Sequence, residues 1–296
     1  MNAKFNLPDF VMGQPVYSIF HEWMSSHPEI LLPNTEIACV YGNFPGCIWN
    51  GGGMNFGSQY TRAHIQEVIN FYNYVLHIPL RFTFTNPLVD ERHLNDVYGN
   101  IIAECGHNGM NEILTSSVVL EKYLREKYPN YKYGKSIIAT REEPFDLSDK
   151  YFLTVMRRRM NNNWDFLETI PADLRHKVEF LCTDPCPDNC PRLYTHYRDF
   201  ARAQLELNPN SDCECSMQHV KGPFQYKYLK GLETHISRKL IDEEYLPRGF
   251  NQFKISGRGS ALGAIMGITE YMIKPEYVPD AYATFALEAS RANCLS

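Results

Sequence analysis

The chain has 296 residues, of which 44% are hydrophobic, a size that suits one large domain or two small ones. Its net charge of −5 and pI near 6.1 argue against a general nucleic-acid or membrane-surface binder. No stretch approaches the apolar length of a membrane-spanning helix, and the opening MNAKFNLPDF lacks the pattern of a signal peptide. With nine cysteines, we therefore expect a cytoplasmic protein whose thiols stay reduced.

Short apolar runs alternate with longer helical patterns along the chain. Strands are predicted at 36–41, 80–85, 112–116, 135–140, 151–156, 177–181 and 253–255. Helices are predicted from about residue 61 and at 96–104, 118–128, 163–170, 192–207 and 262–273. This alternation is typical of βαβ units around a parallel sheet.

We therefore predict a single α/β domain over residues 1–296, with a (β/α)8-type barrel as the leading architecture. A polar, cysteine-containing excursion is expected near 208–222. A doubly wound open sheet is the alternative, because strand order cannot be read from one sequence.

Three evenly spaced cysteines, Cys182, Cys186 and Cys190, follow the strand predicted at 177–181. Cys213 and Cys215 lie downstream and could supply a fourth ligand. Thiolates gathered at the end of a strand usually hold an iron–sulfur cluster or zinc. The spacing fits a cubane cluster at least as well as zinc, because structural zinc sites normally combine two short cysteine pairs. A third interpretation is a loop of reduced cysteines without metal.

Polar residues follow most of the predicted strands, where ligands bind in parallel α/β proteins. Asn43 follows the first predicted strand and Ser116 the third, and the fifth leads into Arg157, Arg158 and Arg159. Strand alternation would turn Arg158 to the side opposite its neighbours, so at least one guanidinium should face the mouth and clamp a carboxylate or phosphate. A solvated turn with surface ion pairs is the alternative interpretation.

Two glycine-containing segments also follow predicted strands. The run at 51–53 has neither the Lys-Ser/Thr of a P-loop nor a dinucleotide fingerprint, so we interpret it as a flexible loop. The segment GRGS at 257–260 precedes the last predicted helix, and its amides could bind an anion at the helix N-terminus. No Ser/His/Asp arrangement or paired-carboxylate pattern stands out, so hydrolysis has no visible machinery.

Taken together, these segments resemble a known family, the collagenase-like peptidases (family 32 of the unassigned peptidases). This family includes proteins of oxygen-independent ubiquinone hydroxylation and of RNA hydroxylation. The matching segments occur in family order: IACVYG at 37–42, NEILTSS at 111–117, VMRRRMNN at 155–162, CPDNCPR at 186–192 and FKISGR at 253–258. The chain departs from the family pattern at Ser256 and Arg159, where Glu is usual, and at Cys182, which is additional.

The resemblance implies a barrel with a [4Fe–4S] cluster held by cysteines. Our first hypothesis is that the ligands are Cys182, Cys186, Cys190 and either Cys213 or Cys215. The resemblance also implies oxygen-independent hydroxylation of a small acidic or aromatic substrate or of RNA, and in some members a protein partner completes the site. The residues that would hold an anionic substrate or donor are Arg158 and Arg258, as catalytic residues, and Arg157, Asn43, Ser116 and Lys254. Protease activity finds no support in these residues. A barrel with a structural zinc, which binds or scaffolds without catalysis, is the alternative.

Overall fold

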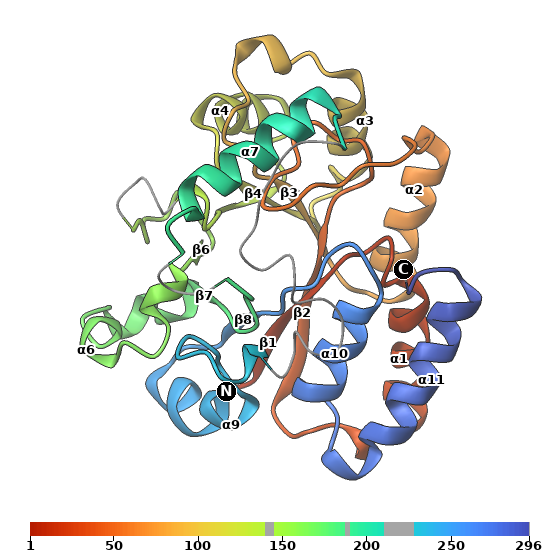
Figure 1. Ribbon diagram of the computed structural model, residues 1–296, viewed down its shortest axis with the longest axis vertical. Helices are drawn as coiled ribbons and strands as arrows, with labels where there is room; N and C mark the ends of the chain where they lie inside the picture. Colours follow the sequence, from red (N-terminus) through yellow and green to blue (C-terminus); the bar gives the residue numbers. More distant parts are fainter. Residues whose placement is uncertain (140–144, 187–189, 210–227, 296) are drawn as a thin grey trace.

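The computed structural model describes residues 1–139, 145–186, 190–209 and 228–295, and within these ranges eight parallel strands form a closed barrel (Figure 1). The strands are β1 (Ala3–Pro8), β2 (Thr35–Gly42), β3 (Leu80–Phe84), β4 (Glu112–Thr115), β5 (Lys132–Lys135), β6 (Thr154–Val155), β7 (Val178–Leu181) and β8 (Gln252–Lys254). Each strand pairs with the next, and β8 pairs with β1 to close the barrel. The predicted α/β barrel is confirmed, and the open-sheet alternative is wrong.

Helices surround the strands on the outside of the barrel. They are α1 (Gln14–Ser26), α2 (Arg62–Asn70), α3 (Val97–Cys105), α4 (Val118–Lys127), α6 (Trp164–Leu167), α7 (Leu193–Glu206), α9 (Arg238–Leu240), α10 (Leu262–Tyr271) and α11 (Val278–Arg291). Helices α1, α10 and α11 pack together on one flank (Figure 1). Among the described residues, no helix has both the length and the apolar character needed to cross a bilayer.

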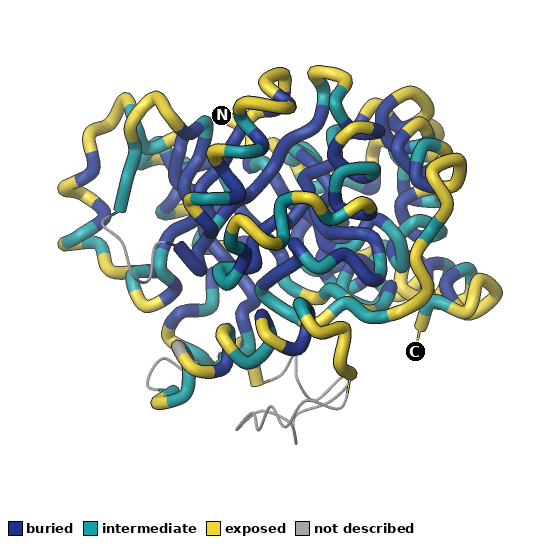
Figure 2. Tube along the Cα trace, turned by 90° about the horizontal axis from the view of Figure 1, so that it is seen from above, coloured by how far each residue is buried: buried dark blue, intermediate teal, exposed yellow. Residues whose placement is uncertain are grey.

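The outer face of the strands carries the main hydrophobic core. Successive side chains of a strand point to opposite faces, so Phe5 and Leu7 of β1 both turn outward, toward the helices. The ring of Phe5 lies 5.7 Å from the ring of Tyr271 in α10, and both residues are fully buried. Burying one such side chain contributes about 1.5–3 kcal/mol. The buried segments gather in the interior and the exposed segments at the rim (Figure 2).

The inner face of the barrel carries a buried network of charges. Arg81 of β3 donates from Nε to Glu112 of β4 at 2.6 Å and from Nη1 to Glu179 of β7. Nζ of Lys254 in β8 lies 3.9 Å from Oε1 of Glu179. Because β3 and β7 are not neighbours, the Arg81–Glu179 contact crosses the barrel interior. Two cations face two carboxylates, which is the balance that allows charges to be buried.

The sequence prediction departs from the structure at two strands. It missed β1, and it placed a strand at 135–140, whereas β5 ends at Lys135 and Ser136 and Ile137 lie beyond it. Most of the excursion predicted near 208–222 lies outside the described residues.

The charge network generates a stability prediction for Arg81→Leu. We expect the free energy of unfolding to fall by about 3–5 kcal/mol, because two buried carboxylates lose the cation that they share. Urea denaturation at neutral pH measures this change. Arg62→Leu is the control, because the ion pair of Arg62 with Glu104 is exposed and worth less than about 1 kcal/mol. A loss below about 1 kcal/mol for Arg81→Leu would contradict a structural role of the network.

Candidate functional site

A pocket of about 540 Å³ lies at the carboxyl ends of the strands, next to the charge network. Its floor and walls come from strand ends on the inner face of the barrel, including Tyr41 of β2, Thr83 of β3 and Lys254 of β8. Side chains of α7 also line it: His196, Tyr197 and Phe200. The pocket therefore lies where α/β barrels bind their ligands.

Helix α7 follows β7 but reaches the loops after β2 and β3. The buried side chain of Gln204 donates from Nε2 to the carbonyls of Cys47 at 3.0 Å and Asn55 at 3.1 Å, and its Oε1 accepts from the Asn55 amide at 2.7 Å. Asn86 Nδ2 donates to the carbonyl of Ala201 at 2.9 Å. These bonds fix α7 across the mouth, and the four-residue spacing of 196, 200 and 204 turns one helix face inward.

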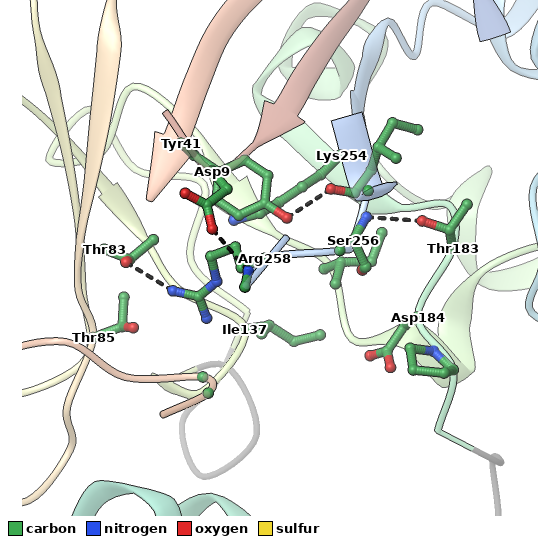
Figure 3. A pocket seen from close by; sticks show the side chains of 18 of the residues that line it. Asp9, Tyr41, Thr83, Thr85, Ile137, Thr183, Asp184, Lys254, Ser256 and Arg258 are labelled. Atoms are coloured by element: carbon green, nitrogen blue, oxygen red, sulfur yellow. Dashed lines mark hydrogen bonds between the residues drawn. The ribbon is translucent and has the colours of Figure 1, made fainter. Parts of the chain in front are cut away.

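Arg258 enters the pocket from the loop after β8 and is held in place by three hydrogen bonds. Its Nη1 donates to Thr83 Oγ1 at 2.9 Å (Figure 3) and to Asn50 Oδ1 at 3.1 Å. Its Nη2 donates to the Gly51 carbonyl at 2.9 Å. The flexible-loop interpretation is wrong for Gly51, because a Cβ there would lie 2.2 Å from the carbonyl oxygen of Thr85. The chain at Gly51 is packed tightly, and its carbonyl helps to hold the guanidinium of Arg258 in one orientation.

Lys254 places its amine on the pocket wall. Its Nζ lies 3.8 Å from the centre of the Tyr41 ring and 3.9 Å from Glu179 Oε1, and no described residue makes a hydrogen bond to it. Burial lowers the pKa of Lys254 to about 8, and the positive charges of Arg81 and Arg258 act in the same direction, while Glu179 opposes the shift. The neutral amine is therefore accessible close to physiological pH.

Asp184 lies across the pocket from Arg258 (Figure 3). Its Oδ1 accepts from the Cys186 amide at 3.1 Å and lies 3.4 Å from Nη1 of Arg158. Its Oδ2 is buried, and within the described ranges no group donates a hydrogen bond to it. Asp184 can therefore accept a proton or a ligand hydrogen bond. The sequence analysis missed it, although its place three residues after β7 was the available signal.

Three of the predicted substrate-site residues line the pocket: Asn43, Lys254 and Arg258. Arg158, a predicted catalytic residue, lies buried behind Asp184 and does not line the pocket, so it can act there only by positioning that carboxylate. Arg157 and Ser116 are partly buried and also lie outside the pocket lining. The alternation argument for the arginines is wrong, because β6 ends at Val155 and residues 158–160 form a 3₁₀ turn.

The anion site predicted at 257–260 is occupied by a carboxylate of the protein itself. Asp9 Oδ2 accepts from the Gly259 amide at 2.7 Å, while Asp9 Oδ1 accepts from the amides of Val11 and Met12. The carboxylate therefore ties the loop after β1 to the loop after β8. Because Asp9 already accepts from the Gly259 amide, that amide is not available to bind an external anion at this turn.

The candidate metal ligands are not brought together by the described part of the chain. Cys182 directly follows β7 and lies in the same hydrophobic core as Phe180, where burial raises the pKa of its thiol well above the usual range. Cys186 lines the pocket, whereas Cys190 precedes α7 and is partly exposed. Cys213 and Cys215 lie outside the described residues.

Within the described residues, no three His, Cys, Asp or Glu side chains are grouped to hold a metal ion. These residues do not form the ligand set of a cluster or of a zinc site by themselves. We leave Cys182 out of the ligand set, because a thiolate is disfavoured in an apolar core.

Comparison with known proteins found no matching family model, no matching curated protein and no matching solved structure. The resemblance to the collagenase-like peptidase family stays a prediction that depends on the five segments named above.

The environment of Lys254 predicts an unusually reactive amine. Only the neutral amine reacts with acetic anhydride, so labelling of Lys254 should rise with pH and reach half its maximum near pH 8. Unperturbed lysines titrate about two pH units higher. Trace labelling followed by peptide mass spectrometry measures the labelling of each lysine as a function of pH. The exposed Lys239 is the internal control. A midpoint near pH 10 for Lys254 would contradict the effect of burial and of the neighbouring Arg81 and Arg258.

Proposed function

We propose that this protein is an enzyme that binds and converts a small organic anion in the pocket at the mouth of its barrel. The observation that carries the proposal is the placement of Lys254 and Arg258 on one wall of the pocket. Both cations lie beside the ring of Tyr41, with Nζ of Lys254 at 3.8 Å and Cζ of Arg258 at 6.0 Å from its centre. Lys254 faces Glu179. The hydrogen bonds of Arg258 go instead to neutral groups, those of Asn50, Thr83 and Gly51. The charge of Arg258 in a partly desolvated pocket therefore favours an anion, most simply a carboxylate.

The remaining walls support a ligand with an apolar or aromatic body. A second cluster of buried hydrophobic residues lines the pocket on the side of β4 to β7: Leu114, Ile137, Ile138, Val155 and Leu181. Phe200 and Tyr197 of α7 add aromatic surface. A carboxylate with a hydrophobic substituent would satisfy both halves of the pocket. A concave pocket of about 540 Å³ favours a small molecule over RNA.

Asp184 gives the pocket a group for proton transfer. Its Oδ1 is oriented by Arg158 and by the Cys186 amide, which leaves Oδ2 to act on a bound ligand. Asp184 would serve as a general base, with Arg158 as its positioning residue. We propose a cytoplasmic location, since the buried thiols of Cys39 and Cys47 fit a reducing compartment.

The direct test compares carboxylate binding by the wild type and by the Arg258→Gln variant, in which we expect weaker binding. We expect at least one member of a panel of aromatic and aliphatic carboxylates to bind the wild type in calorimetry. Its affinity should fall about tenfold or more in the variant, because a hydrogen bond to a charged group contributes about 1.5–3 kcal/mol. Arg92→Gln is the control, because its side chain is 83% exposed on the surface. Equal affinities in the two variants would contradict the proposal.

A second candidate function, iron–sulfur-dependent hydroxylation, is favoured by the position of Cys186 on the pocket wall. On the family resemblance, Cys186 and Cys190 would bind a cluster together with ligands from outside the described residues. A redox-active cluster there would supply the oxidation chemistry, while Lys254 and Arg258 would hold the substrate.

Metal analysis of protein purified without oxygen tests this second function. We expect iron and acid-labile sulfide near four of each per chain, as a cubane cluster requires. Both should be lost in the Cys186→Ser, Cys190→Ser double variant and kept in Cys39→Ser, since Cys39 is buried in the barrel interior beside Asn6. Stoichiometric zinc without sulfide would select the zinc-containing binding protein. The absence of both metals, or unchanged iron in the double variant, would rule out a cluster on these cysteines.

A further inference from the structure

We propose that Lys254 is a nucleophile that forms an imine with the carbonyl carbon of a 2-oxo acid bound in the pocket. The inference rests on the proposed function, because it needs the pocket to bind a small organic anion. It adds a covalent role for one residue and a chemical class for the ligand.

The amine of Lys254 is not committed to the structure in the way that the amine of buried Lys177 is. Lys177, which is equally buried, donates from Nζ to the carbonyls of Leu147 at 3.3 Å and Ser148 at 3.2 Å and to Asp149 at 2.9 Å. In the described part of the chain nothing hydrogen-bonds to Nζ of Lys254, which faces the ring of Tyr41 instead. Its nitrogen is therefore available to a ligand in the pocket.

The surroundings of Lys254 also favour the neutral, nucleophilic form. Burial lowers its pKa to about 8, which is how a lysine is activated for attack on carbonyl carbon. Glu179 Oε1 lies 3.9 Å from Nζ and receives no hydrogen bond from a described residue, while Oε2 of the same carboxylate accepts from Arg81. Glu179 can therefore take up the proton that the amine releases.

The arrangement of the two cations selects the class of ligand. Arg258 is held by Asn50, Thr83 and Gly51 on one side of the Tyr41 ring, and Lys254 contacts the same ring. A 2-oxo acid carries a carboxylate directly next to a carbonyl carbon. Its carboxylate would bind the guanidinium while its carbonyl carbon faces the amine, and its side chain would extend toward the apolar wall.

The reaction needs no oxidant or reductant. The neutral amine attacks the carbonyl carbon, a C–N bond forms, and the carbonyl oxygen takes up a proton to give a carbinolamine. The carbonyl oxygen then leaves as one water molecule with two hydrogens that came from the amine, and a C=N bond remains. Protonation of that nitrogen gives an iminium group, which withdraws electrons from the adjacent carbon atoms.

Reductive trapping on the full chain tests the proposal. The protein is incubated with phenylpyruvate and sodium cyanoborohydride, which reduces an imine to a stable secondary amine, and the adduct is located by peptide mass spectrometry. We expect one adduct per chain, on Lys254, formed at least ten times faster than on any other lysine.

Two variants make the test specific. Lys254→Arg keeps the cation beside Glu179 but cannot form an imine, so it should lose the adduct while calorimetry still detects phenylpyruvate binding. Lys177→Arg replaces a lysine of matched burial and should keep the adduct on Lys254.

The outcomes separate the two proposals. Binding of phenylpyruvate without an adduct on Lys254, or equal labelling of the wild type and Lys254→Arg, would overturn the imine and leave the proposed function standing. Failure of every carboxylate to bind the wild type would overturn both.

Discussion

The charge balance inside the barrel, in which Arg81 bridges Glu112 and Glu179, is the constraint on which the site depends. Barrel interiors of this type are usually filled by branched apolar side chains, so four charged groups must compensate one another here. Arg81 occupies Oε2 of Glu179 and leaves Oε1 toward Lys254. Lys254 is consequently held near the pocket by charge and by the ring of Tyr41 rather than by hydrogen bonds. The network that stabilises the interior thus leaves an amine available at the mouth.

The pocket has a charged wall and an apolar wall, and side chains of helix α7 line it as well. On one side Arg258 is fixed by the loop after β2, while on the other Leu114, Val155 and Leu181 present an apolar wall. Because Gln204 ties α7 to the loop after β2, the same loop supports both Arg258 and the helix. A change in that loop would therefore affect both the cation and the roof of the pocket.

The sequence predicted the barrel because alternating apolar runs and helical patterns report burial directly, and most runs coincide with strands. β1 was missed because its buried Ala3, Phe5 and Leu7 alternate with Lys4 and Asn6 instead of forming a continuous apolar run. β5 was misplaced because Lys132–Lys135 has almost no apolar signal, whereas Ile137 and Ile138 beyond it are apolar for a different reason: they line the pocket. Lys254 and Arg258 were singled out from the segment FKISGR, through its resemblance to a family motif, and both line the pocket. Asp184 and the position of Arg158 behind it depend on contacts between loops that no local pattern encodes.

The most direct test of this account compares one ligand with its neutral analogue. Isothermal calorimetry would measure the affinities of the wild type for a carboxylate that binds and for the primary amide of the same shape. If Arg258 and Lys254 recognise the charge as proposed, the carboxylate should bind at least about ten times more tightly, with the difference reduced in Arg258→Gln. Equal affinities for the acid and the amide would contradict the claim that these two cations define the site.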